Sequence, residues 1–124
     1  MAGYVLIVDD EPDIRRIAKL GLSRVGGMEV VEAANGAEAL VRAKEDKPDA
    51  VLLDVMMPGL DGPSTLARLR EDPATSGIPV VFLTAKAIAA ELDRLKSLGA
   101  AGVLTKPFDP MTLARELRAL LGIS

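Results

Sequence analysis

Polar side chains that could do chemistry stand at the ends of four short apolar runs. The runs VLIVDD, VLLD, VVFLT and VLTK end in Asp9 and Asp10, in Asp54, in Thr84 and in Lys106, respectively. If the runs are parallel strands, their carboxyl ends lie at one edge of a sheet, where open α/β folds bind their ligands. Three carboxylates at that edge would repel one another unless a hard divalent cation bound among them. Such a cluster suits phosphoryl chemistry, in which the charge on phosphate oxygens must be neutralised.

The composition excludes several other kinds of chemistry. The sequence contains neither cysteine nor histidine, so disulfides, thiolate metal sites and histidine-based acid/base catalysis or zinc ligation are ruled out. Any metal must therefore be held by oxygen atoms. The net charge of -3 and the aromatic content of 2% provide neither a basic stripe nor a stacking platform. Direct binding of nucleic acid is therefore not expected.

The length and the hydropathy pattern predict a single domain over residues 1–124. A chain of 124 residues with 49% hydrophobic residues can bury one substantial core. The sequence shows neither a signal peptide after Met1 nor a membrane span, so the cytoplasm is the expected location. The last predicted helix ends at Leu121, and we expect no output domain after it.

Short apolar runs alternate with amphipathic segments about five times, a pattern typical of β/α repeats. Strands are predicted at Tyr4–Val8, Met28–Ala33, Ala50–Leu53, Ile78–Leu83 and Gly102–Leu104. Helices are predicted at Pro12–Val25, Ala37–Lys47, Pro63–Asp72, Ile88–Leu98 and Pro110–Leu121. Glutamates within the second strand mark it as an edge strand. Right-handed crossovers then place helices on both faces, which gives a doubly wound (βα)5 sandwich of the α/β class.

The first predicted helix has a distinct apolar and a distinct charged side. The helical spacing predicts a buried face made by Ile14, Ile17, Ala18, Gly21 and Val25. It places Arg15, Arg16 and Lys19 on the opposite, solvated side.

The motifs LIVDDEP, LLDVMMPGLDG, LTA and TKPF, in this order and spacing, resemble the receiver domain of two-component response regulators, of the CheY-like kind. The motifs extend from Leu6 to Phe108, and the resemblance covers the whole chain. It implies a five-stranded parallel sheet in the flavodoxin-like order 2-1-3-4-5. It also implies Mg²⁺ as the cofactor, a histidine kinase or histidine phosphotransfer domain as the phosphoryl donor, and a downstream protein as the target.

The resemblance makes Asp54 the phosphoacceptor, which would attack a phosphohistidine on the partner. Asp54 and Asp10 would bind Mg²⁺ directly, Asp9 would act largely through a metal-bound water, and the backbone carbonyl of Met56 would complete the set. Acidic residues before a proline also commonly cap a helix, so helix capping remains open as an alternative for Asp9 and Asp10.

Two more residues would contact the phosphoryl group. Lys106 would pair with Asp54 before phosphorylation and with a phosphoryl oxygen afterwards, and the resemblance implies a cis peptide bond to Pro107. Thr84 would donate its hydroxyl to the phosphoryl group, although threonine is also simply common in strands. Gly59, Asp61 and Gly62 are better interpreted as turn-forming residues.

Three positions bear on the conformational switch of the domain and on the lifetime of its phosphorylated form. Val103 stands where the family usually has Tyr or Phe as a rotating switch, so we expect a smaller response that runs through the loop at 85–90. Met56 and Lys86 stand at the positions that tune dephosphorylation in the family, and neither can orient a hydrolytic water. We therefore expect slow autodephosphorylation, because Met56 could shield the acyl phosphate and Lys86 could attract its charge.

Other functions remain as alternatives. An aspartate-based phosphatase usually needs a second acid where Met56 stands. A receiver-like binding module that does not switch, or a phosphate sink, is also open, whereas a flavodoxin is disfavoured because the loop DDEPD is acidic. As a receiver, the protein would catalyse only its own phosphorylation and dephosphorylation. The last two helices could support a weak dimer, or their charged residues could be a solvated face of a monomer, namely Arg94, Lys96, Glu116 and Arg118.

Overall fold

The centre of the fold is a parallel sheet in the order β2-β1-β3-β4-β5, which confirms the predicted topology. The computed structural model describes residues 3–122, so both ends of the predicted 1–124 domain lie outside the described residues. The strands are β1 (Tyr4–Val8), β2 (Glu29–Ala33), β3 (Ala50–Asp54), β4 (Val80–Thr84) and β5 (Gly102–Thr105). The helices are α1 (Pro12–Leu20), the π-helix η1 (Gly21–Val25), α2 (Gly36–Asp46), α3 (Gly62–Glu71), α4 (Ala89–Ser97) and α5 (Leu113–Leu121).

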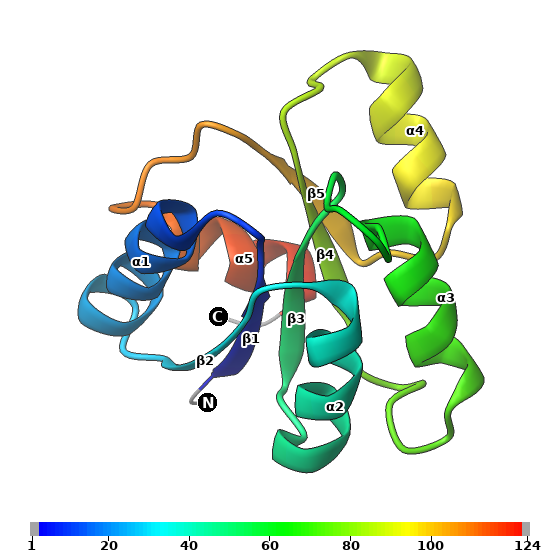
Figure 1. Ribbon diagram of the computed structural model, residues 1–124. Coiled ribbons are helices and arrows are strands. Elements are labelled where there is room, and N and C mark those ends of the chain that lie inside the picture. Colours follow the sequence, from blue (N-terminus) through cyan, green and yellow to red (C-terminus); the bar gives the residue numbers. More distant parts are fainter. Residues whose placement is uncertain (1–2, 123–124) are drawn as a thin grey trace.

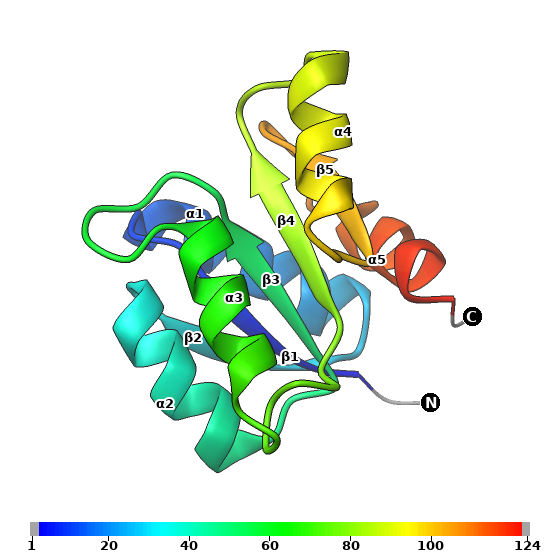
Figure 2. The ribbon, with the colours of Figure 1, turned by 90° about the vertical axis from the view of Figure 1, so that its right-hand side faces the viewer.

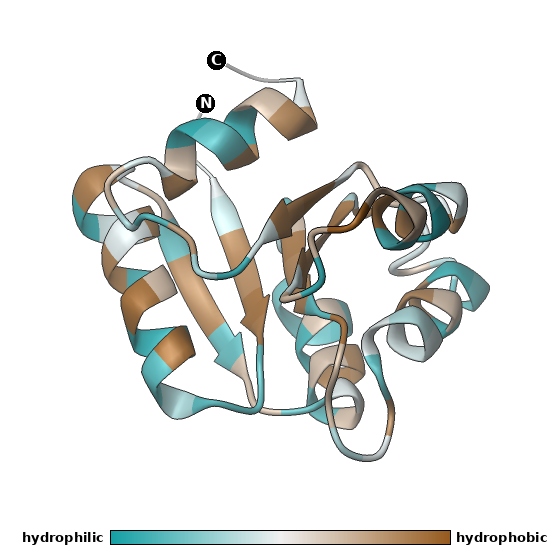
Figure 3. Ribbon diagram, turned by 90° about the horizontal axis from the view of Figure 1, so that it is seen from above, coloured by the Kyte–Doolittle hydropathy of each residue, from teal (hydrophilic) through white to brown (hydrophobic). Residues whose placement is uncertain are grey.

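Helices cover both faces of the sheet (Figure 1). Helices α1 and α5 lie on one face, and α2, α3 and α4 lie on the other. The strands are apolar along most of their length, and the polar residues gather on the outer sides of the helices (Figure 3). This pattern is expected of a parallel sheet that is covered on both sides.

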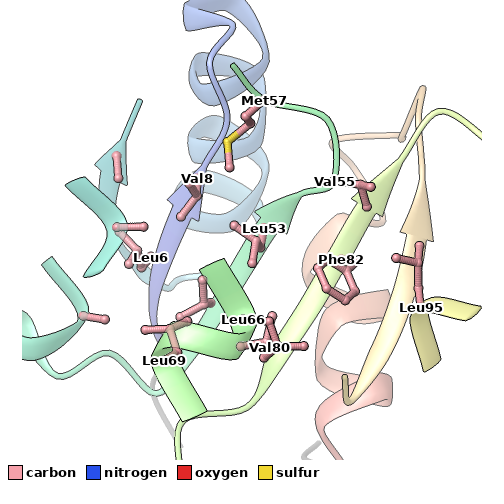
Figure 4. Close-up of a cluster of buried hydrophobic side chains, with 14 residues drawn as sticks. Leu6, Val8, Leu53, Val55, Met57, Leu66, Leu69, Val80, Phe82 and Leu95 are labelled. Carbon is pink, nitrogen blue, oxygen red and sulfur yellow. The ribbon is translucent and has the colours of Figure 1, made fainter. Parts of the chain in front are cut away.

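Alternate residues of each strand supply the two halves of the core. In β1, Leu6 and Val8 point toward α2 and α3, where they join the buried cluster shown in Figure 4. Val5 and Ile7 point the other way, toward α1 and α5. Because the strands are packed from both sides, the residues that follow them at the carboxyl edge are held on a rigid base.

Several predicted boundaries differ from the structure for local reasons. Strand β4 begins at Val80, because Pro79 has no N–H to donate to the ladder. Strand β2 begins at Glu29, since the Met28 N–H is donated to the Leu22 carbonyl. Helix α5 begins at Leu113, because Asp109 holds the preceding residues in a turn by accepting hydrogen bonds from the backbone N–H groups of residues 111–113.

The first helix departs most from the prediction. After Leu20 it widens into the π-helix η1, in which Leu22 is buried and Val25 is 48% exposed. Ile17, earlier in α1, is 40% exposed. Gly21 permits the close contact with the turn before α5, since a Cβ there would lie 2.6 Å from the Pro110 carbonyl oxygen. The predicted buried face is therefore wrong at Ile17 and Val25, and at Val25 the reason is the changed helical period of η1.

Two further findings concern the outer surface. Arg118 of α5 is half-buried and donates a hydrogen bond to the Gly26 carbonyl, so it is not part of a freely solvated face. A search of residues 3–122 finds no helix long and apolar enough to cross a membrane.

Candidate functional site

The carboxyl ends of four strands bring the predicted site residues to one edge of the sheet. Asp9 directly follows β1, and Asp54 is the last residue of the neighbouring strand β3. Thr84 is the last residue of β4, and its backbone carbonyl accepts a hydrogen bond from the Lys106 N–H at 2.8 Å. Figure 2 shows β1, β3 and β4 side by side, with the loops to α1, α3 and α4 leaving from the same edge. These residues are far apart in the sequence, so only the parallel register brings them together.

Asp9, Asp10 and Asp54 form a compact acidic cluster. Each contributes one carboxylate oxygen, and these oxygens lie within 4.8 Å of one another. Asp9 is fully buried and Asp54 is 4% exposed, whereas Asp10 faces solvent. Carboxylates this close repel one another, and burial removes the water that would screen them. The cluster therefore needs nearby positive charge for all three of its carboxylates to be ionised.

Lys106 supplies part of that charge. Its ammonium lies 2.8 Å from Asp9 Oδ2 and 3.2 Å from Asp54 Oδ1, so it pairs with both buried carboxylates. Glu11 Oε1 lies at the limit of an ion pair, 4.0 Å away. The Lys106–Pro107 peptide bond is cis, in the geometry that the family resemblance implies.

The three carboxylates of the cluster, when ionised, and the single ammonium leave two negative charges uncompensated. The donor atoms are all oxygen, which is the ligand type that Mg²⁺ prefers. The residues present therefore fit a divalent cation in both charge and chemistry.

The electrostatic environment shifts two pKa values in the cluster. Burial, followed by the charge of Asp9, raises the pKa of Asp54 from 3.8 to about 6, although the nearby Lys106 opposes the shift. Burial lowers the pKa of Lys106, but the hydrogen bond to Asp9 and the charges of Asp54 and Asp9 outweigh it, so the pKa is raised overall. At neutral pH Lys106 is therefore charged, and the Asp54 carboxyl is mostly ionised.

Helix capping does not account for Asp9 and Asp10. The N-cap residue of α1 is Glu11, and among residues 3–122 its side chain makes no capping hydrogen bond. Asp9 Oδ1 instead accepts the Glu11 N–H at 2.9 Å, which fixes the turn between β1 and α1. Asp9 and Asp10 are thus placed by the strand and its turn rather than by the helix.

Thr84 lies beside the cluster and is 2% exposed. Its hydroxyl oxygen accepts a hydrogen bond from the Lys86 N–H at 3.0 Å, so the threonine side chain is tied to the backbone of the β4–α4 loop. Lys86 itself is exposed, as are all residues from 85 to 90.

The two remaining predicted positions, Met56 and Val103, differ in burial. Met56 follows the buried Val55, and its side chain is 75% exposed at the rim of the site. Val103 is half-buried in β5, paired with Phe82 of β4, and packs against the core on the side of α2, α3 and α4.

Gly62 has a role that the sequence interpretation missed. Its φ is not in the left-handed region, in contrast to Gly59, whose φ is +76°. A Cβ at Gly62 would lie 2.5 Å from the Asp54 carbonyl oxygen and 2.8 Å from Val55 Cα. Gly62 is therefore required because α3 begins directly against the end of β3. Asp61 next to it caps α3, since its Oδ1 accepts the Ser64 N–H at 2.8 Å.

Arg15 is the other residue that was misplaced. The pattern put it on the solvated side of the first helix, but its side chain is only 17% exposed and it contacts both Asp9 and Glu32. Glu32, one of two glutamates in the edge strand, was the signal in the sequence that could have pointed to a basic partner.

Comparisons with known proteins agree with this geometry. The family model of the response regulator receiver domain matches residues 5–118. The protein PilH of Pseudomonas aeruginosa is 40% identical over 120 residues, which cover 94% of this chain and 96% of PilH. The probable transcriptional regulator ycf27 of Cyanophora paradoxa is 44% identical over 117 residues, covering 94% of this chain and 47% of that protein. The chain spans about half the length of several such curated relatives.

A solved structure shows the same fold. The chemotaxis response regulator CheY4 of Vibrio cholerae matches with a TM-score of 0.88 and 33% identity, covering 97% of this chain and 99% of that one. The fold and the acidic edge define a doubly wound α/β domain with a carboxylate cluster at the carboxyl ends of its strands. The chain belongs to the response regulator receiver domain family, and thus to the two-component signalling proteins.

Proposed function

We propose that this receiver domain accepts a phosphoryl group on Asp54 from a phosphohistidine of a histidine kinase or histidine phosphotransfer domain. The observation that carries the proposal is the position of Asp54, almost buried at the end of the central strand β3, between an acidic cluster and the ammonium of Lys106. A carboxylate is a weak nucleophile unless the incoming group is held in line and its charge is offset. The Lys106 ammonium beside Asp54 supports the proposal, because it can offset charge on the incoming group.

Each neighbouring side chain has a part in that transfer. The Asp54 carboxylate oxygen forms a bond to phosphorus while the bond from phosphorus to the histidine nitrogen breaks, and the imidazole leaves with the electron pair. Lys106, now paired with Asp54 at 3.2 Å, then moves its charge to a phosphoryl oxygen. The Thr84 hydroxyl donates to another phosphoryl oxygen.

Mg²⁺ is the cofactor that this donor set supports. Asp10 and Asp54 would hold it directly, Asp9 largely through a water, and the Met56 carbonyl would be a further ligand. When bound, the ion neutralises charge on the phosphoryl oxygens. Lys106 must then share Asp9 and Asp54 with the cation, because it contacts both carboxylates.

Phosphorylation would be communicated through the β4–α4 loop. If Thr84 turns toward the phosphoryl group, its hydroxyl pulls on the Lys86 N–H to which it is bonded. The exposed residues 85–90 can follow at little cost, because they bury no side chain. Val103 has no ring to swing into the vacated space, so the response is smaller than with an aromatic residue. Backbone chemical shifts with and without a phosphoryl analogue test this, and an undiminished change reaching α5 would contradict it.

The biological setting follows from this chemistry. The protein signals through contacts with a downstream protein, acts in the cytoplasm, and catalyses only its own phosphorylation and dephosphorylation. It is a monomer or a weak dimer through α4 and α5.

The proposal is tested by intact-protein mass spectrometry after incubation with acetyl phosphate and Mg²⁺. We expect the mass of one added phosphoryl group, dependent on Mg²⁺ and absent in Asp54→Asn. Asp61→Asn is the matched control, because asparagine also caps helices and should leave the adduct unchanged. A wild-type protein that binds Mg²⁺ but gains no mass would refute the proposal and favour a binding module that does not switch.

A further inference from the structure

Arg15 is a charged residue that the helix turns inward instead of toward solvent. Its side chain is 17% exposed, whereas that of the adjacent Arg16 is 72% exposed and lies 3.6 Å from Asp13 within the same helix. Both arginines are on the same helix, so the difference comes from what each one contacts. Ordering a long charged side chain costs conformational entropy, and Arg15 has contacts that compensate for it.

Two contacts hold the guanidinium of Arg15. Nη1 donates a hydrogen bond of 2.7 Å to the backbone carbonyl of Asp9, and Nε donates one of 3.2 Å to Glu32 Oε1. Glu32 belongs to the edge strand β2, where its backbone pairs with β1 at Ile7. Lys19 lies 3.7 Å from the other Glu32 oxygen. The planar guanidinium thus links α1, β2 and the carboxyl end of β1.

Asp9 is consequently fixed at every polar group. Its N–H is donated to Ala33 O at 3.2 Å, and its carbonyl accepts Arg15. Its carboxylate accepts the Glu11 N–H at 2.9 Å and the Lys106 ammonium at 2.8 Å. Lys106 also pairs with Asp54, so its contact with the Asp9 carboxylate can change. Arg15, in contrast, contacts only the main chain of Asp9 and does not compete for its carboxylate.

We infer that Arg15, oriented by Glu32, is a positioning residue that holds the backbone of Asp9 so that the carboxylates of Asp9 and Asp10 meet that of Asp54 at a binding distance. The carbonyl of Asp9 is also the start of the peptide that leads to Asp10, so a hydrogen bond to it restrains both residues. A hydrogen bond from a charged donor is stronger than a neutral one. This inference rests on the proposed function, because the proposed phosphoryl transfer requires the acidic cluster to bind Mg²⁺.

The inference predicts a loss of Mg²⁺ affinity without loss of the fold. Groups that orient metal ligands typically change affinity by about 10-fold to 100-fold when removed. Arg15→Met, which keeps an unbranched apolar stem but loses every hydrogen-bond donor of the guanidinium, is expected to raise the Kd for Mg²⁺ about tenfold in calorimetric titrations. Arg15→Lys keeps the charge but reaches only one partner at a time, so it should recover part of the affinity. Arg16→Met is the matched control and should bind Mg²⁺ as the wild type does.

A purely structural arginine would give a different result. It would lower the midpoint of urea unfolding and leave the Kd of the folded protein unchanged, and that outcome would overturn the inference. If Arg15→Met does not fold, Glu32→Gln provides the test, since it removes the charge that orients Arg15. This variant should weaken Mg²⁺ binding by a smaller factor than about tenfold. An unchanged Kd in Glu32→Gln would also overturn it.

A readout without metal completes the test. Faster hydrogen exchange of the Glu11 amide, which Asp9 Oδ1 accepts, is expected in metal-free Arg15→Met. Phosphorylation is followed separately in the same proteins. If the wild type binds Mg²⁺ but is not phosphorylated, the proposed function fails. The role of Arg15 is then still decided by comparing the Kd for Mg²⁺ of Arg15→Met with that of the wild type.

Discussion

Replacing Asp54 by asparagine is expected to stabilise the metal-free protein at neutral pH. Burial, followed by the charge of Asp9, raises the pKa of Asp54 from 3.8 to about 6, and Lys106 offsets only part of this shift. Because the folded-state pKa lies above the unfolded value, folding favours the protonated carboxyl. The contribution of this group to stability is therefore complete below pH 3.8 and is lost as the pH rises through about 6.

The size of the effect follows from the same shift. A change of about two pKa units corresponds to about 3 kcal/mol, which is an upper bound. Asparagine keeps the shape of the side chain but loses the ion pair with Lys106, so part of the gain is lost. We expect Asp54→Asn to be about 1–3 kcal/mol more stable at pH 7, and each kcal/mol corresponds to roughly 4 °C in Tm for a domain of this size.

The assay is urea unfolding followed by circular dichroism, in EDTA at pH 7 and pH 4. At pH 4 the difference should fall below about 1 kcal/mol, since the wild-type carboxyl is then protonated in the folded state. Asp13→Asn, at a side chain that is 85% exposed, is the control and should change stability by less than about 0.5 kcal/mol. Adding Mg²⁺ to 100 times its Kd should stabilise the wild type by about 2.7 kcal/mol and the variant by less. A variant that is no more stable than the wild type at pH 7, or a gain that does not depend on pH, would refute the reasoning.

Three further predictions concern the residues around the phosphoacceptor. Lys106→Met should raise the pKa of Asp54 further and tighten Mg²⁺ binding roughly tenfold, because a unit charge about 4 Å away contributes up to about 4 kcal/mol near a protein surface. Calorimetry measures the Kd for Mg²⁺, and weaker binding in the variant would contradict the competition between Lys106 and the cation for the carboxylates. Gly62→Ala should destabilise the fold by about 1–3 kcal/mol and slow phosphorylation, since its Cβ would lie 2.5 Å from the Asp54 carbonyl oxygen. An unchanged midpoint of urea unfolding and an unchanged rate of phosphorylation by mass spectrometry would show that the chain relaxes freely there. Lys86→Glu should shorten the lifetime of the phosphorylated protein after the donor is removed, and a longer lifetime would count against a protective role of the lysine charge.

The parts of the fold that could be predicted depend on local patterns. Continuous apolar runs such as VVFLT are buried on both faces only inside a covered sheet, so the existence of the strands could be predicted and is confirmed. The strand order, which is also confirmed, was implied by the family resemblance rather than by these patterns. The boundaries at Val80 and Leu113 were missed because they depend on which backbone groups find partners, and the partners are set by neighbouring segments. The first helix was misjudged because its last five residues form a π-helix, whose period a pattern of 3.6 residues does not predict.

The candidate site divides in the same way. Asp9, Asp10, Asp54 and Lys106 could be identified because each stands where an apolar run ends, and the structure brings them together. The environments of Arg15 and Gly62 could not, since nothing in the chain around either residue shows the Asp9 carbonyl or the Asp54 carbonyl that it meets.

The sequence by itself determined the alternation of strands and helices, the oxygen-only chemistry and the residues at the strand ends, because these depend on residue type and on spacing along the chain. Only the tertiary structure decided the charge relations: that Lys106 bridges Asp9 and Asp54, that the pKa of Asp54 is raised to about 6, and that Arg15 binds the backbone of Asp9. Burial and distances of a few ångströms set these properties, and both arise only when strands that are remote in sequence lie side by side.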